Sequence, residues 1–466
     1  MAADPDKKSI LLITASGSFL APFMVSSLIV AIPAIGREFS MSAVEMSQLA
    51  TAFFLAASMF LVPFGRAADI LGVKRIFTAG IYIYLFSALL AAFAPSSLIL
   101  IGARFLTGVG AAMIFGTSFA LLSLTLPQSE RGQALGINIS ASLLGFALGF
   151  QIGGLLTYYV NWRGFFLLTL PIDLLVIALL RLKLPVECAL SKGQKLDLPG
   201  SALIAVMLFA IVAGFSELPG LEGALLLIAG LIFFIVFARR EWHSKSPIID
   251  MRLLSKNRPF ALANGAVLAY NAGSFGVIFL FSLYLQYILE FDTRQVGLVL
   301  LVFTLIMAAL VSFAGRLSDR FRPYLIASMG ILITLLGLLL LFMIISPVMP
   351  LTEALIGFLL IVIGGALFPP PMVKTVLSCI PREMYGLGGS LAEMMRLLGN
   401  TMSMAFISIA FAHFLRGNAI TPENYTNLIS SMRAIFVIFS LFMAATLLMI
   451  FWYAYLKRRR NGITCE

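Results

Sequence analysis

The chain has 466 residues, of which 61% are hydrophobic and 11% are charged. Soluble domains carry about 25% charged residues, and a soluble monomer with this composition would expose too much apolar surface, so we expect a membrane protein. The net charge of +11 does not indicate nucleic-acid binding, because the basic excess lies in short loops between apolar segments.

Fourteen apolar segments of helical length follow one another along the chain. A bilayer core of roughly 30 Å needs about 20 apolar residues of helix, and these continuous runs lack the alternation of an outer-membrane barrel. The predicted spans are 10–34, 47–64, 76–94, 97–124, 133–158, 164–182, 199–216, 222–239, 259–288, 294–314, 323–346, 352–373, 385–412 and 431–456. Without the pair at 199–239 twelve would remain. We expect no cleavable signal peptide, because the first apolar run is a full span.

Positive charge gives the expected orientation. Cytosolic loops of membrane proteins carry an excess of Lys and Arg. With the N-terminus in the cytosol, most of the 32 Lys and Arg residues fall in cytosolic loops. The outer loops then hold Arg37, Arg163, Arg294, Arg416 and Arg433. We therefore predict a multi-pass protein of the cell (inner, cytoplasmic) membrane with both termini in the cytosol.

A short pattern occurs twice, each time at the cytosolic end of a predicted span. Gly65 and Asp69 follow the second span, and Gly315 and Asp319 follow the tenth with the same spacing. Such a repeat suggests two six-helix halves related by an axis along the membrane normal. We predict an all-α fold with an N-terminal six-helix bundle (1–185), a linker with two extra transmembrane helices (186–258) and a C-terminal six-helix bundle (259–466).

Several motifs resemble those of the major facilitator superfamily of secondary transporters, in particular its fourteen-span drug:proton antiporter branch. The loop after span two is similar to the family motif G-x-x-x-D-x-x-G-x-[RK]-[RK], through Gly65, Asp69, Gly72, Lys74 and Arg75. Span four resembles a second motif through Arg104, Gly108 and Gly110. Span five resembles the antiporter motif through Gly145, Gly149, Gly153 and Gly154, with Phe150 where the family usually has Pro. The resemblance covers essentially the whole chain.

The repeated loops are candidates for conformational gating, as the resemblance implies. Gly65 and Gly72 would allow tight turns or close helix approach. Asp69 would accept hydrogen bonds from a neighbouring helix N-terminus, where negative charge is favoured, and such a contact can hold one conformation. The alternative is a solvated loop carboxylate without a role. Lys74, Arg75, Gly315 and Asp319 complete this set.

Four charged residues lie inside predicted spans, and they are our proton-coupling candidates: Arg104, Asp173, Glu393 and Arg396. A charge inside the bilayer costs at least about 2.5 kcal/mol, so it usually marks function or a partner. Glu393 and Arg396 are three residues apart and can pair on one helix face, either for function or as a structural ion pair.

Asp173 has no counterpart in the resemblance, which places span six at the bundle's periphery. Members of this branch often carry an Asp in the first span before Ala-Leu-Pro, but here Met24 holds that position before Ala31-Ile32-Pro33. Asp173, two residues after Pro171, is the acid that we place nearest the membrane midplane. It is either a proton or cation carrier or a structural carboxylate.

Polar residues inside spans are candidates for a substrate cavity. They are Ser26 and Ser27 in span one, Asn138 and Gln151 in span five, and Asn264, Tyr270, Asn271 and Ser274 in span nine. In the family, span nine lines the central cavity, so Asn and Tyr there would contact substrate. The alternative is interhelical hydrogen bonding. The four glycines of span five form a helix-packing motif, with or without a part in antiport.

These features predict a secondary active transporter that exports small amphipathic compounds, a multidrug-type efflux antiporter with alternating access. Its partners would be a small-molecule substrate, the lipid bilayer and protons, and the family implies a monomer. The alternative is a metabolite transporter, or a facilitator without proton coupling. An enzyme is not expected: the three cysteines and two histidines form no cluster at metal spacing, so we predict no cofactor and no metal. A channel is disfavoured by the repeat and the gating-type loops.

Overall fold

The computed structural model describes residues 7–127, 130–183, 197–218, 220–244, 251–381 and 384–462. These residues form helices and turns without a strand. The main helices are α1 (Lys7–Glu38), α2 (Ala43–Leu71), α3 (Val73–Ala92), α4 (Ser97–Thr125), α5 (Arg131–Tyr159), α6 (Arg163–Lys183), α7 (Leu198–Ser216), α8 (Leu221–His243), α9 (Met251–Lys256), α10 (Arg258–Ser274), α11 (Gly276–Leu283), α12 (Thr293–Arg320), α13 (Pro323–Ile344), α14 (Leu351–Leu367), α15 (Pro369–Leu377), α16 (Tyr385–Leu415) and α17 (Tyr425–Gly462). Within the described residues, fourteen helical segments are long and apolar enough to cross a membrane, which confirms the predicted fold class.

Two predicted spans are interrupted. α14 ends at Leu367 and α15 begins at Pro369, as the three prolines 369–371 require, because proline has no N–H to donate. The predicted span 259–288 divides into α10, α11 and the π-helical turn η1 (Tyr284–Ile288). The division at Phe275 has a tertiary cause: the Gly276 amide donates to the Ser403 hydroxyl of α16 at 2.9 Å. The sequence did not reveal this second break.

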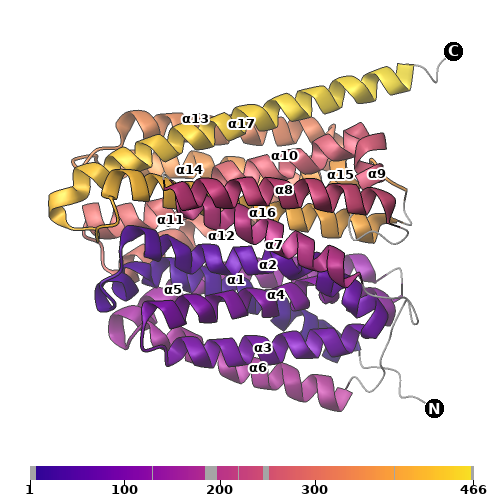
Figure 1. Cartoon of the computed structure of the whole chain (residues 1–466), viewed down its shortest axis with the longest axis horizontal. Coiled ribbons are helices and arrows are strands. Elements are labelled where there is room, and N and C mark those ends of the chain that lie inside the picture. The colour runs from indigo at the N-terminus through magenta and orange to yellow at the C-terminus, as the bar shows by residue number, and fades with distance from the viewer. Residues whose placement is uncertain are drawn as a thin grey trace. The chain divides into compact units, whose positions relative to one another are not determined.

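The chain divides into two compact units, each described here by itself. The first unit comprises Met1–Ile211, Ala229–Phe237 and Phe291–Val302. Within it α1 packs on α5, α4 lies against α2 and α3, and α3 also contacts α6. These helices run from indigo to magenta in Figure 1. Short residues permit the close contacts: a Cβ built on Gly110 of α4 would lie 3.0 Å from the Tyr84 nitrogen of α3.

The second unit comprises Val212–Ile228, Ala238–Glu290 and Phe303–Glu466. Here α10 packs on α16 and α17, and α13 packs on α14 and α17. When the two halves are compared in chain order, the packing of α10 on α16 and α17 corresponds to that of α1 on α5 and α6. The packing of α13 on α14 and α17 corresponds to that of α3 on α4 and α6. The repeated packing is what an internal duplication produces.

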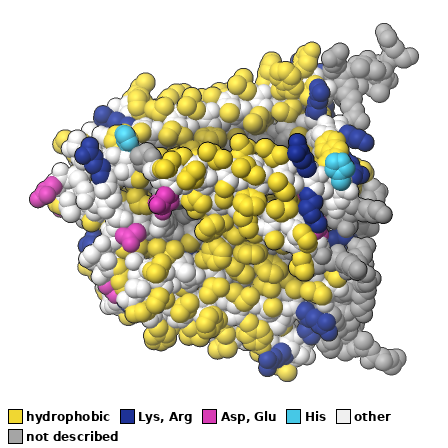
Figure 2. All heavy atoms as spheres, viewed as in Figure 1, with side chains coloured by type: hydrophobic (Ala, Val, Ile, Leu, Met, Phe, Trp, Pro, Cys, Tyr) yellow, Lys and Arg dark blue, Asp and Glu magenta, His cyan; other side chains and the backbone are white. Residues whose placement is uncertain are grey.

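The outer faces of the helices are apolar. Figure 2 shows hydrophobic side chains over the middle of the helices in view and charged side chains toward helix ends. On α8, Leu225, Ile228, Leu231, Ile232 and Ile235 are exposed. An apolar face of this extent suits lipid rather than water.

Candidate functional site

The first copy of the repeated Gly-Arg-x-x-Asp pattern lies where α2 passes into α3. Gly72 joins the two helices with a φ of 116°, a backbone region that side chains other than glycine rarely adopt, and its amide donates to the Ala68 carbonyl at 2.9 Å. Lys74 and Arg75 follow in the first turn of α3. Gly65 meets Gly116 of α4, whose added Cβ would lie 3.4 Å from the Gly65 Cα. Glycine is therefore required at 72 by conformation. At the contact of α2 with α4 the tight position is Gly116, whereas a Cβ on Gly65 would lie 3.7 Å from its nearest atom.

Asp69 forms an ion pair with Arg66 of the same helix, at 3.9 Å between Oδ2 and Nη1. Both side chains are about one-third exposed. Among the described residues of its unit, no helix N-terminus donates a hydrogen bond to Asp69. The proposed locking contact stays a prediction.

The second copy of the motif is paired across two helices. Asp319, near the end of α12, forms an ion pair with the Lys374 ammonium of α15, at 2.5 Å between Oδ1 and Nζ. The same ammonium donates to the Gly315 carbonyl at 3.3 Å. Both partners of the ion pair are partly exposed. Lys374 therefore ties the end of α12 to α15 through two residues of the motif, which the sequence did not indicate.

The glycines of span five bring α5 against α1. A Cβ built on Gly145 would overlap the Phe19 carbonyl, one on Gly149 would overlap Ser26, and one on Gly153 would lie 2.6 Å from the Ser27 Cα. The Ser27 hydroxyl donates to the Gly149 carbonyl at 2.9 Å. This is the packing role expected of small residues in membrane helices.

Three further small or polar residues of α1 and α5 are also engaged in packing. The Ser26 hydroxyl donates to the Pro22 carbonyl of its own helix at 2.9 Å. Asn138 accepts from the Thr14 hydroxyl at 3.2 Å. Gly154 faces α12, where the Thr293 hydroxyl donates to its carbonyl at 3.0 Å.

Two charged side chains are fully buried in the first unit. Arg104 of α4 and Asp173 of α6 both have 0% exposure. Neither Asp173 carboxyl oxygen, nor Nε and Nη1 of Arg104, has a hydrogen-bond partner among the described residues. The Arg104 guanidinium carbon lies 5.0 Å from the centre of the Phe53 ring of α2. A buried charge without a partner costs several kcal/mol, so these groups are the best candidates for a functional site.

Tyr84 of α3 connects the two buried charges, and the sequence prediction missed it. Its side chain is fully buried, and it lies within electrostatic range of both Asp173 and Arg104. Its hydroxyl donates to the Leu20 carbonyl of α1 at 2.9 Å. Met24, which holds the position of the family's first-span acid, lies one helical turn beyond Leu20. Tyrosine in an apolar helix is common, so only the contact of α3 with α4 and α6 could reveal this arrangement.

The second pair of span charges lies on α16. Arg396 binds Glu393 with two hydrogen bonds, Nε to Oε2 at 2.9 Å and Nη2 to Oε1 at 2.5 Å. The side chains are 41% and 35% exposed. The helical spacing that predicted a pair therefore corresponds to a two-point contact, the stronger geometry for an Arg–carboxylate pair.

The polar residues of α10 divide into two groups. Tyr270 is engaged in packing: its ring stacks on Phe368 at 3.7 Å between centroids, and its hydroxyl lies 3.2 Å from that of Thr334 on α13. Asn264 is 2% exposed, with its Oδ1 unpartnered among the described residues. Asn271 and Ser274 are part-buried and bond to carbonyls of their own helix.

Gln151 of α5 likewise has a buried Oε1 without a partner among the described residues. Its amide oxygen and that of Asn264 are the atoms of the predicted cavity set that are both buried and without a partner among the described residues. Within the described part of the chain, no group of three His, Cys, Asp or Glu side chains could hold a metal ion.

Comparison with known proteins shows which family the chain belongs to. The model of the major facilitator superfamily matches residues 14–404, and it matches again over residues 263–464. The chain belongs to the major facilitator superfamily. This confirms the predicted resemblance, and family and fold are those of transporters rather than enzymes.

Relatives within the superfamily carry different substrates in their names. The chain is 28% identical to the riboflavin transporter RibZ of Clostridioides difficile over 88% of this chain and 89% of that one. It is 30% identical to the puromycin resistance protein pur8 of Streptomyces alboniger over 84% and 80%. It is 26% identical to the multidrug resistance protein Stp of Mycobacterium tuberculosis over 88% and 77%.

Solved superfamily structures share the fold. A bacterial homologue of the human lysosomal transporter Spinster, crystallised inward-facing and unoccupied, superposes with a TM-score of 0.67 at 16% identity, over 97% of this chain and 98% of that one. A D-xylose–proton symporter gives 0.64 at 14% identity, over 94% and 97%. At these identities the likeness shows the fold alone.

Proposed function

We propose that this superfamily member exports small amphipathic organic compounds in exchange for protons, by alternating access. Its similarity to drug-resistance proteins supports the substrate class. The observation that carries the coupling is the fully buried Asp173 carboxyl without a hydrogen-bond donor among the described residues. A carboxyl group in such a place is stable only when it holds a proton or gains a partner, so a cycle that changes its surroundings would bind and release a proton.

Asp173 would take the place of the missing first-span acid. Tyr84 lies within electrostatic range of Asp173 and is hydrogen-bonded to the Leu20 carbonyl, one turn before Met24. A proton on Asp173 would therefore be sensed at α1 through Tyr84. Arg104, also buried in range of Tyr84, would stabilise the deprotonated carboxylate when the helices shift.

The remaining sequence candidates take supporting roles in this proposal. The loop set Gly65, Asp69, Gly72, Lys74 and Arg75, with Gly315 and Asp319, would gate the cytosolic side. Gln151, Asn264, Asn271 and Ser274 would offer hydrogen bonds to substrate. The pair of Glu393 and Arg396 is the alternative candidate for proton coupling. From the basic loops we infer that both termini lie in the cytosol and that the protein lies in the cell membrane, and we expect a monomer.

A second candidate function is transport of a flavin or similar metabolite without proton coupling. The similarity to RibZ extends over most of both chains. In addition, this chain has Met24 at the position where the antiporter branch often has an acidic residue. Riboflavin is also a planar amphipathic compound, so the substrates alone do not separate the two hypotheses.

Measuring two modes of transport distinguishes substrate binding and translocation from proton coupling. Proteoliposomes are loaded with ethidium, puromycin or riboflavin, and we measure exchange at equal pH and accumulation driven by a pH gradient. We expect Asp173→Asn to retain exchange and to lose accumulation, whereas Glu393→Gln, which tests the competing coupling candidate, should retain both. Loss of both modes in folded Asp173→Asn, or retention of both, would contradict the coupling role.

A further inference from the structure

A basic pocket lies at one end of the second unit, between the start of α13, the end of α15 and the last turns of α17. Its volume is about 670 Å³, and its walls include Arg322, Tyr324, Lys374, Tyr453, Lys457 and Arg458. Among the described residues that line it, four are cationic and none is acidic. None of its lining residues belongs to the polar face of α10.

The cations of the basic pocket are held by neutral hydroxyl groups. Arg322 donates to the Tyr324 hydroxyl at 3.2 Å, and Arg458 hydrogen-bonds the same hydroxyl. Two guanidinium groups therefore converge on one uncharged oxygen. Their mutual repulsion would be relieved by an anion bound between them.

The opposite wall repeats this arrangement. The Lys457 ammonium donates to the Tyr453 hydroxyl at 3.1 Å and lies 3.5 Å from the Ser378 hydroxyl. Lys374 is the exception, because Asp319 neutralises it. Among the described residues, no ion pair joins a carboxylate to Arg322, Lys457 or Arg458.

The start of α13 adds to the positive potential. The helix has 22 residues, and no side chain caps its first turn. Pro323 has no N–H and the Leu325 amide donates to the Arg322 carbonyl at 3.0 Å, so the contribution of this end is the positive end of the helix dipole, which attracts anions. Three uncompensated cations, hydroxyl donors and a helix N-terminus around one cavity are the donor set that a phosphate oxygen requires.

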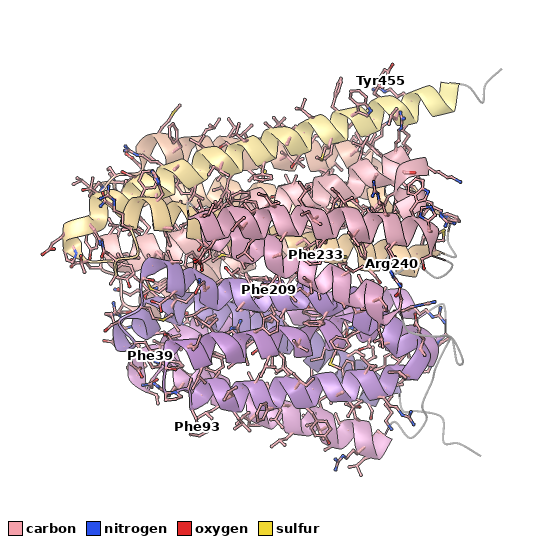
Figure 3. All side chains as sticks on the ribbon, viewed as in Figure 1. Phe39, Phe93, Phe209, Phe233, Arg240 and Tyr455 are labelled. Atoms are coloured by element: carbon pink, nitrogen blue, oxygen red, sulfur yellow. The ribbon has the colours of Figure 1, made fainter. Side chains whose placement is uncertain are left out.

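We propose that the basic pocket binds the phosphate of an anionic phospholipid headgroup. The pocket stands at the ends of membrane-spanning segments, where Pro323–Ile344 begins and Pro422–Arg458 ends. Apolar side chains lead away from it along both helices: Leu325, Met329 and Leu332 of α13, and Phe451, Trp452 and Tyr455 of α17, are exposed. Tyr455 lies on the outward side of α17 in Figure 3. A headgroup in the pocket could therefore extend its acyl chains along these faces, which a soluble phosphate ester could not use.

Lipid titration of the purified full chain tests the proposal. The protein in detergent is titrated with dioleoyl phosphatidylglycerol or dioleoyl phosphatidylcholine, and bound lipid is counted by native mass spectrometry. We expect the wild type to prefer phosphatidylglycerol about tenfold or more, and Lys457→Gln/Arg458→Gln to weaken its binding roughly 10- to 30-fold. The control Lys183→Gln/Lys256→Gln removes two charges from other exposed helix ends and should leave binding unchanged.

A second variant and a competition experiment complete the test. Arg322→Gln changes a different helix and should weaken binding about fivefold, so the proposal can be tested even if the double variant does not fold. Glycerol phosphate and inorganic phosphate are added as competitors, and they should not displace the lipid. Equal affinity for the two lipids, unchanged binding in the folded variants, or displacement by the soluble phosphates would overturn the assignment to a lipid.

Discussion

Replacing Gly153 by Ala tests the contact between α1 and α5. The added methyl group would lie 2.6 Å from both Cα and Cβ of Ser27, about 1 Å inside ordinary contact, so the helices must separate. Overpacking of this kind costs about 1–3 kcal/mol. The neighbouring hydrogen bond from Ser27 to Gly149 at 2.9 Å would lengthen, and interhelical bonds in membranes contribute about 0.6–1.7 kcal/mol. We expect a total loss of about 2–4 kcal/mol.

The assay is thermal unfolding of the purified protein in detergent. At about 2–4 °C per kcal/mol for a unit of this size, the unfolding midpoint should fall by roughly 4–16 °C. Gly136→Ala is the matched control on the same helix, since nothing lies within 4 Å of its added Cβ, and Ala in a helix is favoured over Gly by up to about 1 kcal/mol. Equal midpoints for the two variants would refute the close approach of α1 and α5 at Gly153.

Further substitutions probe the loops and the buried tyrosine. Gly72→Ala should lower stability by about 1–3 kcal/mol because of the positive φ, whereas Gly65→Ala, with its nearest atom at 3.7 Å, should change the unfolding midpoint little. Lys374→Met should lower the free energy of unfolding by at most about 1 kcal/mol, because its partner Asp319 is 69% exposed. If the ion pair gates transport, the transport rate should fall far more than the small change in the unfolding midpoint explains. The charge swap Lys374→Asp with Asp319→Lys should then restore the transport rate. Tyr84→Phe should lower the free energy of unfolding by about 0.5–1.5 kcal/mol, because it removes one buried hydrogen bond while the Leu20 carbonyl keeps its partner within α1. An unchanged unfolding midpoint would show that this hydrogen bond is not formed.

The number and kind of membrane helices could be predicted from the sequence because each span is a continuous apolar run. Local rules were also sufficient for the break before Pro369, which follows from a missing N–H, and for the pairing of Glu393 with Arg396, which follows from the helical spacing. The division of span nine at Phe275 could not be predicted, since it depends on Ser403 far along the chain.

The arrangement of the buried charges also depends on tertiary contacts. Arg104 and Asp173 stand out in the sequence as charges within spans, but nothing local indicates that Tyr84 lies near both. Similarly, Tyr270 has the composition of a cavity residue, yet stacks on Phe368. Polarity within a span therefore identifies candidates, and packing decides which of them keep free hydrogen-bonding groups.

Proton movement driven by substrate is the most direct test of the central claim. The wild type and Asp173→Asn are reconstituted in liposomes that contain a pH-sensitive dye, and an outward gradient of ethidium or puromycin is imposed at equal pH. The proposal predicts proton movement opposite to the substrate in the wild type and none in Asp173→Asn. Substrate flux without proton movement in the wild type, or proton movement that persists in the variant, would contradict antiport through Asp173.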